Sequence, residues 1–163
     1  MATMDNLAAA FAGESQANRR YLAFAKKAEA EGFLQAAKLF RAAAAAETVH
    51  AHNHLGVAGG ISDTEANLKA AIKGETFEYR EMYPGFIAEA GAADEKRAKW
   101  SFEVANKVEE IHAGLFEAAL SAMSNAPGPD YYVCEVCGNT VAGGPEDKCS
   151  VCGAPKEKFM RVE

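Results

Sequence analysis

The chain has 163 residues, 49% of them hydrophobic, and a formal net charge of −6. This length allows one ordinary domain plus a small one, with enough apolar residues for a buried core. The acidic balance argues against a nucleic-acid-binding surface, because phosphate contacts need clustered Lys and Arg. No signal-peptide pattern is present, and no window approaches about 18 apolar residues. We therefore expect a soluble, cytoplasmic protein without nucleic-acid or membrane partners.

Residues 4–124 have the composition of helices. They contain a single proline, and their apolar residues recur at intervals of three and four. Breaks are expected near Gly32, at residues 56–63 and at residues 90–94. These breaks divide the segment into four helices of about 20 to 30 residues, which predicts an all-α four-helix bundle.

The third helix carries two local signals. Asp63, followed closely by Glu65, is its expected N-cap. Pro84 removes a backbone donor and clashes with the preceding turn, so we expect it to kink the helix.

The composition changes after the predicted bundle. The run "SNAPGPD" at residues 124–130 cannot continue a helix, and beyond it short segments are punctuated by Gly and Cys. We therefore predict a bundle domain over residues 1–124, a linker over residues 125–130 and a small metal-knuckle domain over residues 131–163.

The first two helices resemble the second two. Gly-Glu pairs begin at Gly13 and Gly74, and the segments "FRAAAAAETVHA" and "FEVANKVEEIHA" begin at Phe40 and Phe102. In both segments Glu follows Phe by seven residues, and His follows that Glu by three. The interval from the first glutamate to the second is 33 residues in one copy and 34 in the other.

The repeated motif predicts a di-metal site. Residues three apart on a helix lie about one turn apart on the same face, so Glu47 with His50, and Glu109 with His112, can each bind one metal ion. A single Glu-x-x-His is weak evidence, because an exposed acid beside a core histidine gives the same pattern. Two copies, each preceded by a helix with a Gly-Glu pair, match the ligands of a carboxylate di-metal site in a four-helix bundle.

The charge of the predicted interior supports the same site. Up to five carboxylates would face the bundle interior, which is prohibitive unless cations neutralise them. These are Glu14, Glu47, Glu75, Glu78 and Glu109. Glu47 and Glu109 are the natural bridging ligands, while Glu14 and Glu75 would be terminal. Oxygen-rich sites with an imidazole suit iron or manganese.

Glu78 breaks the symmetry of the repeat, because Ala17 occupies the equivalent position in the first copy. Glu78 lies one turn after Glu75, so it would face the first metal and compete there with His50 as a ligand.

Two tyrosines and two histidines near these motifs carry weaker signals. Tyr21 and Tyr83 could hydrogen-bond the ligand carboxylates, although bundle aromatics need no such role. His52 and His54 are expected to be solvated or to lie behind the ligands.

Two Cys-x-x-Cys pairs, separated by eleven residues, form the second motif. The four thiols are Cys134, Cys137, Cys149 and Cys152. Their arrangement is a strong signal for a tetrahedral metal site, and a module of this size needs a metal to fold. Zinc would make this module structural, whereas iron would make it a one-electron carrier. The spacing of the cysteines is compatible with either metal.

With both motifs in place, the chain resembles the rubrerythrin family over essentially its whole length. The matching segments are "GESQANRRY", "ETVH", "GETFEYREMYPGF", "EEIH" and "YVCEVCGN…CSVCGAPKEKF". The resemblance implies a ferritin-like di-iron bundle joined to a rubredoxin-type Fe(Cys)4 domain. It also implies a peroxide reductase that acts in oxidative-stress defence.

The resemblance also assigns roles to individual residues. The iron ligands of the bundle are Glu14, Glu47, Glu75, Glu78, Glu109 and His112, and those of the tail are Cys134, Cys137, Cys149 and Cys152. His50 replaces Glu78 when the site is reduced, and Tyr21 and Tyr83 match tyrosines behind the ligands. Ser150 departs from the proline that the family often has, and is expected to loosen the knuckle.

Three functions fit these sequence features. The leading one is a peroxidase that reduces hydrogen peroxide to water at two iron ions. The rubredoxin-like centre re-reduces these ions with electrons from an external donor, such as a rubredoxin or an NAD(P)H-dependent reductase. The alternatives are a ferroxidase or iron-handling protein and a zinc-ribbon adaptor that only binds partners. Zinc or manganese could replace iron on expression.

The connector between the second and third helices predicts the assembly. A chain that closes its own bundle must span about 26 Å here. The eight residues 56–63 reach at most about 26 to 29 Å when fully stretched. We therefore predict a domain-swapped homodimer, with an unswapped dimer and a shorter third helix as the alternative. His112 lies about 18 Å along its helix from Ser124, so a partner's rubredoxin-like domain is expected to dock closer than the chain's own.

Overall fold

The computed structural model describes residues 2–123 and 127–163. Ser124 and residues 125–126, where the predicted linker begins, lie outside the described residues. The helices and the small C-terminal strand domain confirm the predicted class, a helical fold with a small tail domain. The chain forms two compact units, Met1–Ser62 and Asp63–Glu163. The predicted domain boundary at residue 124 stays a prediction.

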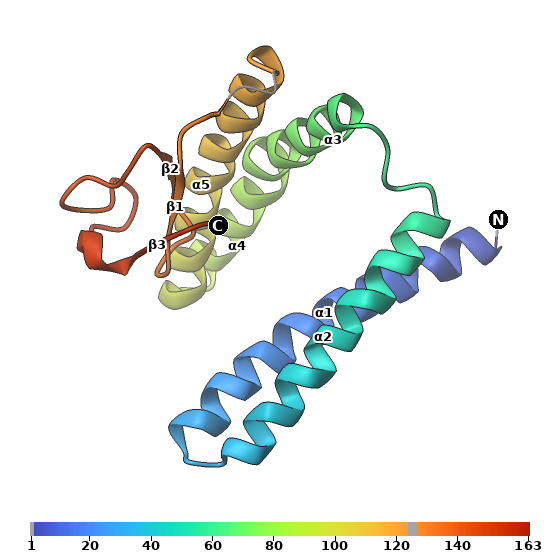
Figure 1. The fold of residues 1–163 in the computed structure, drawn as a ribbon. Helices are drawn as coiled ribbons and strands as arrows, with labels where there is room; N and C mark the ends of the chain where they lie inside the picture. The colour runs from blue at the N-terminus through green and yellow to red at the C-terminus, as the bar shows by residue number, and fades with distance from the viewer. Residues whose placement is uncertain (1, 124–126) are drawn as a thin grey trace. The chain divides into compact units, whose positions relative to one another are not determined.

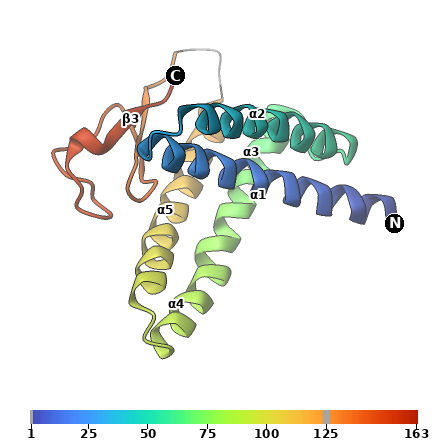
Figure 2. The ribbon, with the colours of Figure 1, turned by 90° about the horizontal axis from the view of Figure 1, so that it is seen from below.

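The first unit is a helical hairpin. Helix α1 (Ala2–Ala30) and helix α2 (Leu34–Val57) lie side by side in both views (Figure 1; Figure 2). The turn between them contains Gly32 with φ +84°, a conformation that favours glycine, so the predicted break is confirmed. Alanines dominate the buried contact, which lets the two helices approach closely.

A buried asparagine links the two helices of the hairpin. The Asn18 side chain is 8% exposed, and its Nδ2 donates to the Ala44 carbonyl at 2.7 Å and to Thr48 Oγ1 at 2.8 Å. A buried amide left without partners would be destabilising, so these bonds fix the pairing of α1 with α2.

The second unit begins with a helix in three segments. These are α3 (Thr64–Phe77), the π-helical turn η1 (Glu78–Met82) and α4 (Tyr83–Ala92). Asp63 Oδ1 accepts a hydrogen bond from the Ala66 amide at 2.8 Å, which confirms the predicted N-cap. The irregularity expected at Pro84 begins earlier, at Glu78. Helix α5 (Lys96–Ser121) returns along α3 and α4.

The C-terminal tail is a small antiparallel sheet in the order β2-β1-β3. Its strands are β1 (Tyr131–Cys134), β2 (Thr140–Ala142) and β3 (Phe159–Arg161), with a short 3-10 turn η2 (Lys156–Lys158) before β3. Strand β2 contacts α5 of the same unit (Figure 1). None of the helices in the described residues is long and apolar enough to span a membrane.

Candidate metal centres

The first cluster of ligand atoms lies on the α1–α2 hairpin. Glu14 from α1 meets Glu47 and His50 from α2, with their ligand atoms all within 4.8 Å of one another. His50 Nδ1 lies 2.8 Å from Glu47 Oε2, as expected for residues one turn apart. The His50 side chain is 53% exposed and that of Glu47 is 17% exposed. The imidazole is therefore the more exposed of these two side chains.

The second cluster repeats this arrangement in the second unit. Glu75 from α3 meets Glu109 and His112 from α5, again within 4.8 Å. His112 Nδ1 lies 2.9 Å from Glu109 Oε2 and 3.8 Å from Glu75 Oε2. Sequence reasoning placed all six side chains together, and the structure brings them together as two groups of three.

The acidic groups of the second cluster perturb one another's proton binding. Burial, a hydrogen bond to Glu109 and that residue's charge together raise the pKa of Glu75 to about 7, against a smaller lowering by His112. Burial and the charge of Glu109 also raise the pKa of Glu78, and the hydrogen bond to Glu109 raises the pKa of His112. Protons thus take the place of cations here, and divalent metal ions would replace them.

Glu78 lies in the π-helical turn, outside the three-residue cluster. The turn accounts for the unequal intervals of the repeat. Tyr21 follows Glu14 by seven residues, whereas Tyr83 follows Glu75 by eight. The wider π turn accommodates the extra residue. The side chains of the helical segments before and after it therefore keep the same orientation as in the first repeat. It is also the turn that carries Glu78, the carboxylate that the first copy lacks.

Both repeats contain the same aromatic triad behind the ligands. The triads are Tyr21, Phe24 and Phe40 in the first unit and Tyr83, Phe86 and Phe102 in the second, with ring centroids 5.5 to 6.4 Å apart. Phe24 and Phe86 were missed from the sequence, although each follows its tyrosine by three residues. The equivalence of the two triads shows that the second repeat is longer by one residue from the π turn onward.

The charges of the acidic cluster act on Tyr83. Burial raises its pKa, and the charges of Glu109, Glu78 and Glu75 raise it further. The phenol therefore stays protonated and can donate a hydrogen bond toward the carboxylates. This supports the predicted role of Tyr83 more strongly than that of Tyr21, whose described contacts are with its aromatic neighbours.

The four cysteines converge in the tail. Their sulfur atoms all lie within 4.8 Å of one another, with Cys134 Sγ 3.8 Å from Cys152 Sγ and Cys137 Sγ 3.6 Å from Cys149 Sγ. Burial raises the pKa of the Cys149 thiol, but hydrogen bonds from backbone amides and a side-chain amide outweigh it and lower the pKa to about 6. A thiolate is therefore favoured where a tetrahedral metal needs one.

That side-chain amide belongs to Asn139, which is 1% exposed. Its Nδ2 lies 3.5 Å from Cys149 Sγ and 3.4 Å from Ser150 Oγ. The Ser150 hydroxyl accepts this contact from Asn139 beside the sulfur, and the expectation that Ser150 loosens the knuckle stays a prediction. Asn139 follows the second cysteine by two residues, and only its spacing could have drawn attention to it.

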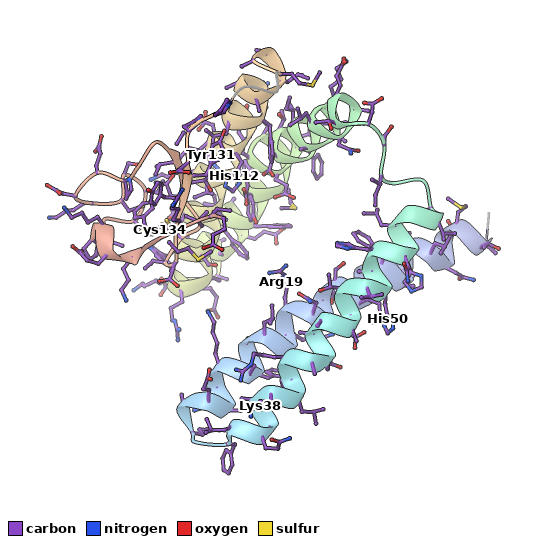
Figure 3. The ribbon with its side chains drawn as sticks, viewed as in Figure 1. Arg19, Lys38, His50, His112, Tyr131 and Cys134 are labelled. Atoms are coloured by element: carbon purple, nitrogen blue, oxygen red, sulfur yellow. The ribbon has the colours of Figure 1, made fainter. Side chains whose placement is uncertain are left out.

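The tail also contacts the second cluster directly. Thr140 Oγ1 lies 2.9 Å from His112 Nε2, on the side of the imidazole opposite Glu109. A chain's own tail can therefore reach the ligands of α5 although it starts at the far end of that helix, and closer docking by a partner's domain stays a prediction. The chain folds back along α5, so the distance from His112 to the helix end does not separate the two sites (Figure 3).

These features define a class: ferritin-like carboxylate di-metal proteins with a tetrathiolate tail. The donor sets of the Glu/His and Cys clusters fit a di-iron site and an Fe(Cys)4 site. The sequence matches the family model described as "Rubrerythrin" over residues 5–120, and that of the "Rubrerythrin, rubredoxin-like domain" over residues 132–160. The chain belongs to the rubrerythrin family.

Individual relatives agree with this assignment. "Rubrerythrin-2" of Clostridium acetobutylicum is 35% identical, over 97% of this chain and 95% of the relative. "Nigerythrin" of Nitratidesulfovibrio vulgaris is 32% identical, over 96% of this chain and 85% of the relative. The solved structure of fully reduced, all-ferrous nigerythrin matches with a TM-score of 0.61, covering 98% of this chain and 86% of that chain.

Proposed function

We propose that the protein is a non-haem iron peroxidase that reduces hydrogen peroxide to water in oxidative-stress defence. The observation that carries the proposal is the pairing of two Glu/His clusters with a four-cysteine centre in one chain. Iron storage needs no attached electron carrier, and an adaptor needs no convergent carboxylates. We also propose a cytoplasmic location and an external electron donor, such as a rubredoxin or an NAD(P)H-dependent reductase.

The chain's own residues would supply ligands and protons. Glu14, Glu47, Glu75, Glu109 and His112 hold the ions, which when bound would provide the two electrons that cleave the O–O bond. Forming two water molecules from H2O2 also takes up two protons.

Protonated groups lie at the second cluster to supply them. Glu75 has a pKa of about 7 and so exchanges a proton near neutral pH, and the phenol of Tyr83 remains protonated beside it. With metal bound, the carboxylates become ligands, so the Tyr83 hydroxyl is the donor that persists.

Glu78 and His50 provide an exchangeable ligand position. A hard carboxylate favours ferric iron, whereas an imidazole tolerates ferrous iron better. We propose that Glu78 binds the first iron in the oxidised site and His50 binds it in the reduced site. The exposed imidazole of His50 has the freedom that such an exchange needs.

We further propose a domain-swapped homodimer. Helix α2 ends at Val57, seven residues past His50, and α3 begins at Thr64, eleven residues before Glu75. A chain that brought its own clusters to the same depth would have to span about 27 Å along the axis and about 10 Å across it, or about 29 Å in total. The seven Cα–Cα steps from Val57 to Thr64 reach at most about 25 Å.

Co-expression of two damaged chains tests the swap. Chains with Glu47→Ala and chains with Glu109→Ala carry different tags, and the mixed dimer is purified. A swapped dimer combines both lesions in one site and leaves the other intact, so iron binding and peroxide reduction persist at half the wild-type stoichiometry. Mixed dimers that contain only singly damaged sites would exclude the swap. The matched control is Glu110→Ala, an exposed neighbour of Glu109 on α5.

Separate assays of the two centres test the peroxidase function. Cys149→Ser should abolish donor-linked turnover, while the chemically reduced bundle still consumes one equivalent of peroxide per di-iron site. Loss of both activities together would contradict this division of labour. The second candidate, a ferroxidase, would be favoured if dioxygen oxidised added Fe(II) catalytically while peroxide left the reduced site unchanged.

A further inference from the structure

The contact between Thr140 and His112 joins the two domains of this chain at a metal ligand. Val108 and His112 lie four residues apart on one face of α5, and both meet the tail. Val108 is 3% exposed, and its Cγ1 lies 3.9 Å from the place that a Cβ on Gly138 would take. The imidazole of His112 meets Thr140 one turn further on.

The hydrogen bonds of Thr140 indicate which nitrogen of the His112 ring carries a proton. The Thr140 hydroxyl donates to the Gly138 carbonyl at 3.2 Å, so its oxygen remains available as an acceptor. The partner 2.9 Å away is His112 Nε2, which must then carry a proton. That tautomer leaves Nδ1, which points at Glu109, as the ring nitrogen for a metal.

We propose that Thr140 is the positioning residue of His112, and that the segment from Cys137 to Thr140 connects the two metal centres within one chain. Metal-binding histidines commonly donate their second ring N–H to a carboxylate, a carbonyl or water, which fixes the ring and its tautomer. Here the acceptor at 2.9 Å is the Thr140 hydroxyl from the electron-carrier domain. Glu109 and, less strongly, the backbone of Gly138 in the same segment as Thr140 also hydrogen-bond the ring and raise the pKa of His112. The orientation of His112 therefore depends on docking of the tail on α5.

The same segment is also bonded to the sulfur centre. Cys137 precedes Gly138 directly, and Asn139 contacts Cys149 Sγ. An electron leaving Cys137 can therefore follow the backbone of Gly138 and the hydroxyl of Thr140 to the His112 ring. This route rests on the proposed electron relay, whereas the positioning role of Thr140 does not.

Two measurements on three variants test the proposal. Thr140→Val removes the acceptor and keeps the shape, Thr140→Ser restores the hydroxyl, and Val141→Ala changes the next residue of β2 as a control for docking. The first measurement is the His112 Nε2–H signal in 15N-resolved NMR spectra of zinc-loaded protein. The second is the rate at which the tail's ferric absorption band returns when the fully reduced iron protein is mixed with peroxide.

We expect Thr140→Val to expose the Nε2 proton to rapid exchange with water. We expect it to slow return of the tail band about 10- to 100-fold, with Thr140→Ser and Val141→Ala within about twofold of wild type. An unchanged Nε2–H signal in Thr140→Val would overturn the positioning role. Equal slowing in Thr140→Val and Val141→Ala would overturn the route, because it would report loose docking. If wild-type protein consumes no peroxide, the proposed function fails, but the NMR comparison still decides the role of Thr140.

Discussion

Deletion of Arg80 should convert the π-helical turn into ordinary α-helix without unfolding the protein. In an α-helix one residue contributes about 100° of rotation and about 1.5 Å of rise, so a deletion normally turns one half of a helix away from its contacts. At η1 the extra residue is already accommodated locally. Removing it leaves Tyr83 seven residues after Glu75, the interval that the first repeat uses between Glu14 and Tyr21.

The cost in stability should be small. Arg80 is exposed, its guanidinium carbon lies 5.3 Å from the Tyr79 ring centroid, and its Nε donates to the Tyr79 hydroxyl at 2.8 Å. An exposed cation–π contact contributes about 0.5 to 1 kcal/mol, so we expect the free energy of unfolding to fall by about 1 kcal/mol or less. Glu75 should keep its place beside α5, while Glu78 should turn away from the cluster.

Urea unfolding and iron retention measure these effects. The deletion variant should unfold cooperatively and keep its iron when reduced, but lose iron on oxidation. Deletion of Lys107 is the control, because regular α-helix surrounds it and Phe102 should turn out of the aromatic triad. Loss of a core Phe costs about 3 to 5 kcal/mol. The reasoning is refuted if the Arg80 deletion destabilises as much as the control, or if it retains iron equally in both states.

Three further predictions concern single side chains. The pKa of Glu75 rises from 4.5 to about 7 on folding. Its protonated form therefore stabilises the metal-free protein at low pH, and this stabilisation is lost as pH rises from 4.5 to 7. After allowance for solvent screening, urea unfolding of the metal-free protein should show a fall of about 1 kcal/mol across that range, and Glu75→Gln should remove it. Glu78→Ala should lower iron retention in the oxidised protein more than in the reduced one; equal losses would make Glu78 an ordinary structural ligand. Asn139→Ala should lower the reduction potential of the tail iron by about 50 mV, because a hydrogen bond to sulfur stabilises the more negative reduced centre, and voltammetry that shows no shift would contradict this.

Local chemistry explains which parts of the fold could be predicted. The break at Gly32 and the cap at Asp63 depend on a few neighbouring residues, and both are where the sequence predicts them. The π turn is harder to predict, because Pro84 signals an irregularity without giving its form. The sequence indicates the turn only through the intervals between paired glutamates, which are 33 residues in the first repeat and 34 in the second. The aromatic triads, once aligned, show that the extra residue lies in the π turn.

Contacts between domains could not be predicted in the same way. Thr140 is 28 residues from His112 and belongs to no metal motif. Its role depends on how the tail docks on α5, where Val108 lies beside Gly138, and this contact follows no recognisable sequence pattern. Asn139 likewise becomes significant only when the knuckle brings Cys149 within reach of its amide.

Both departures from the symmetry of the repeat fall on its second copy. The first copy provides Glu14, Glu47 and His50, and the second adds to the equivalent set one carboxylate in a π turn and one hydroxyl from the tail. The added carboxylate allows a ligand exchange, and the hydroxyl ties a ligand to the electron carrier. Damage to the first copy should therefore weaken metal binding alone, because its ligands have no described bond to the tail. Damage at His112 should also disturb the four-cysteine centre, since Thr140 and Gly138 lie between them.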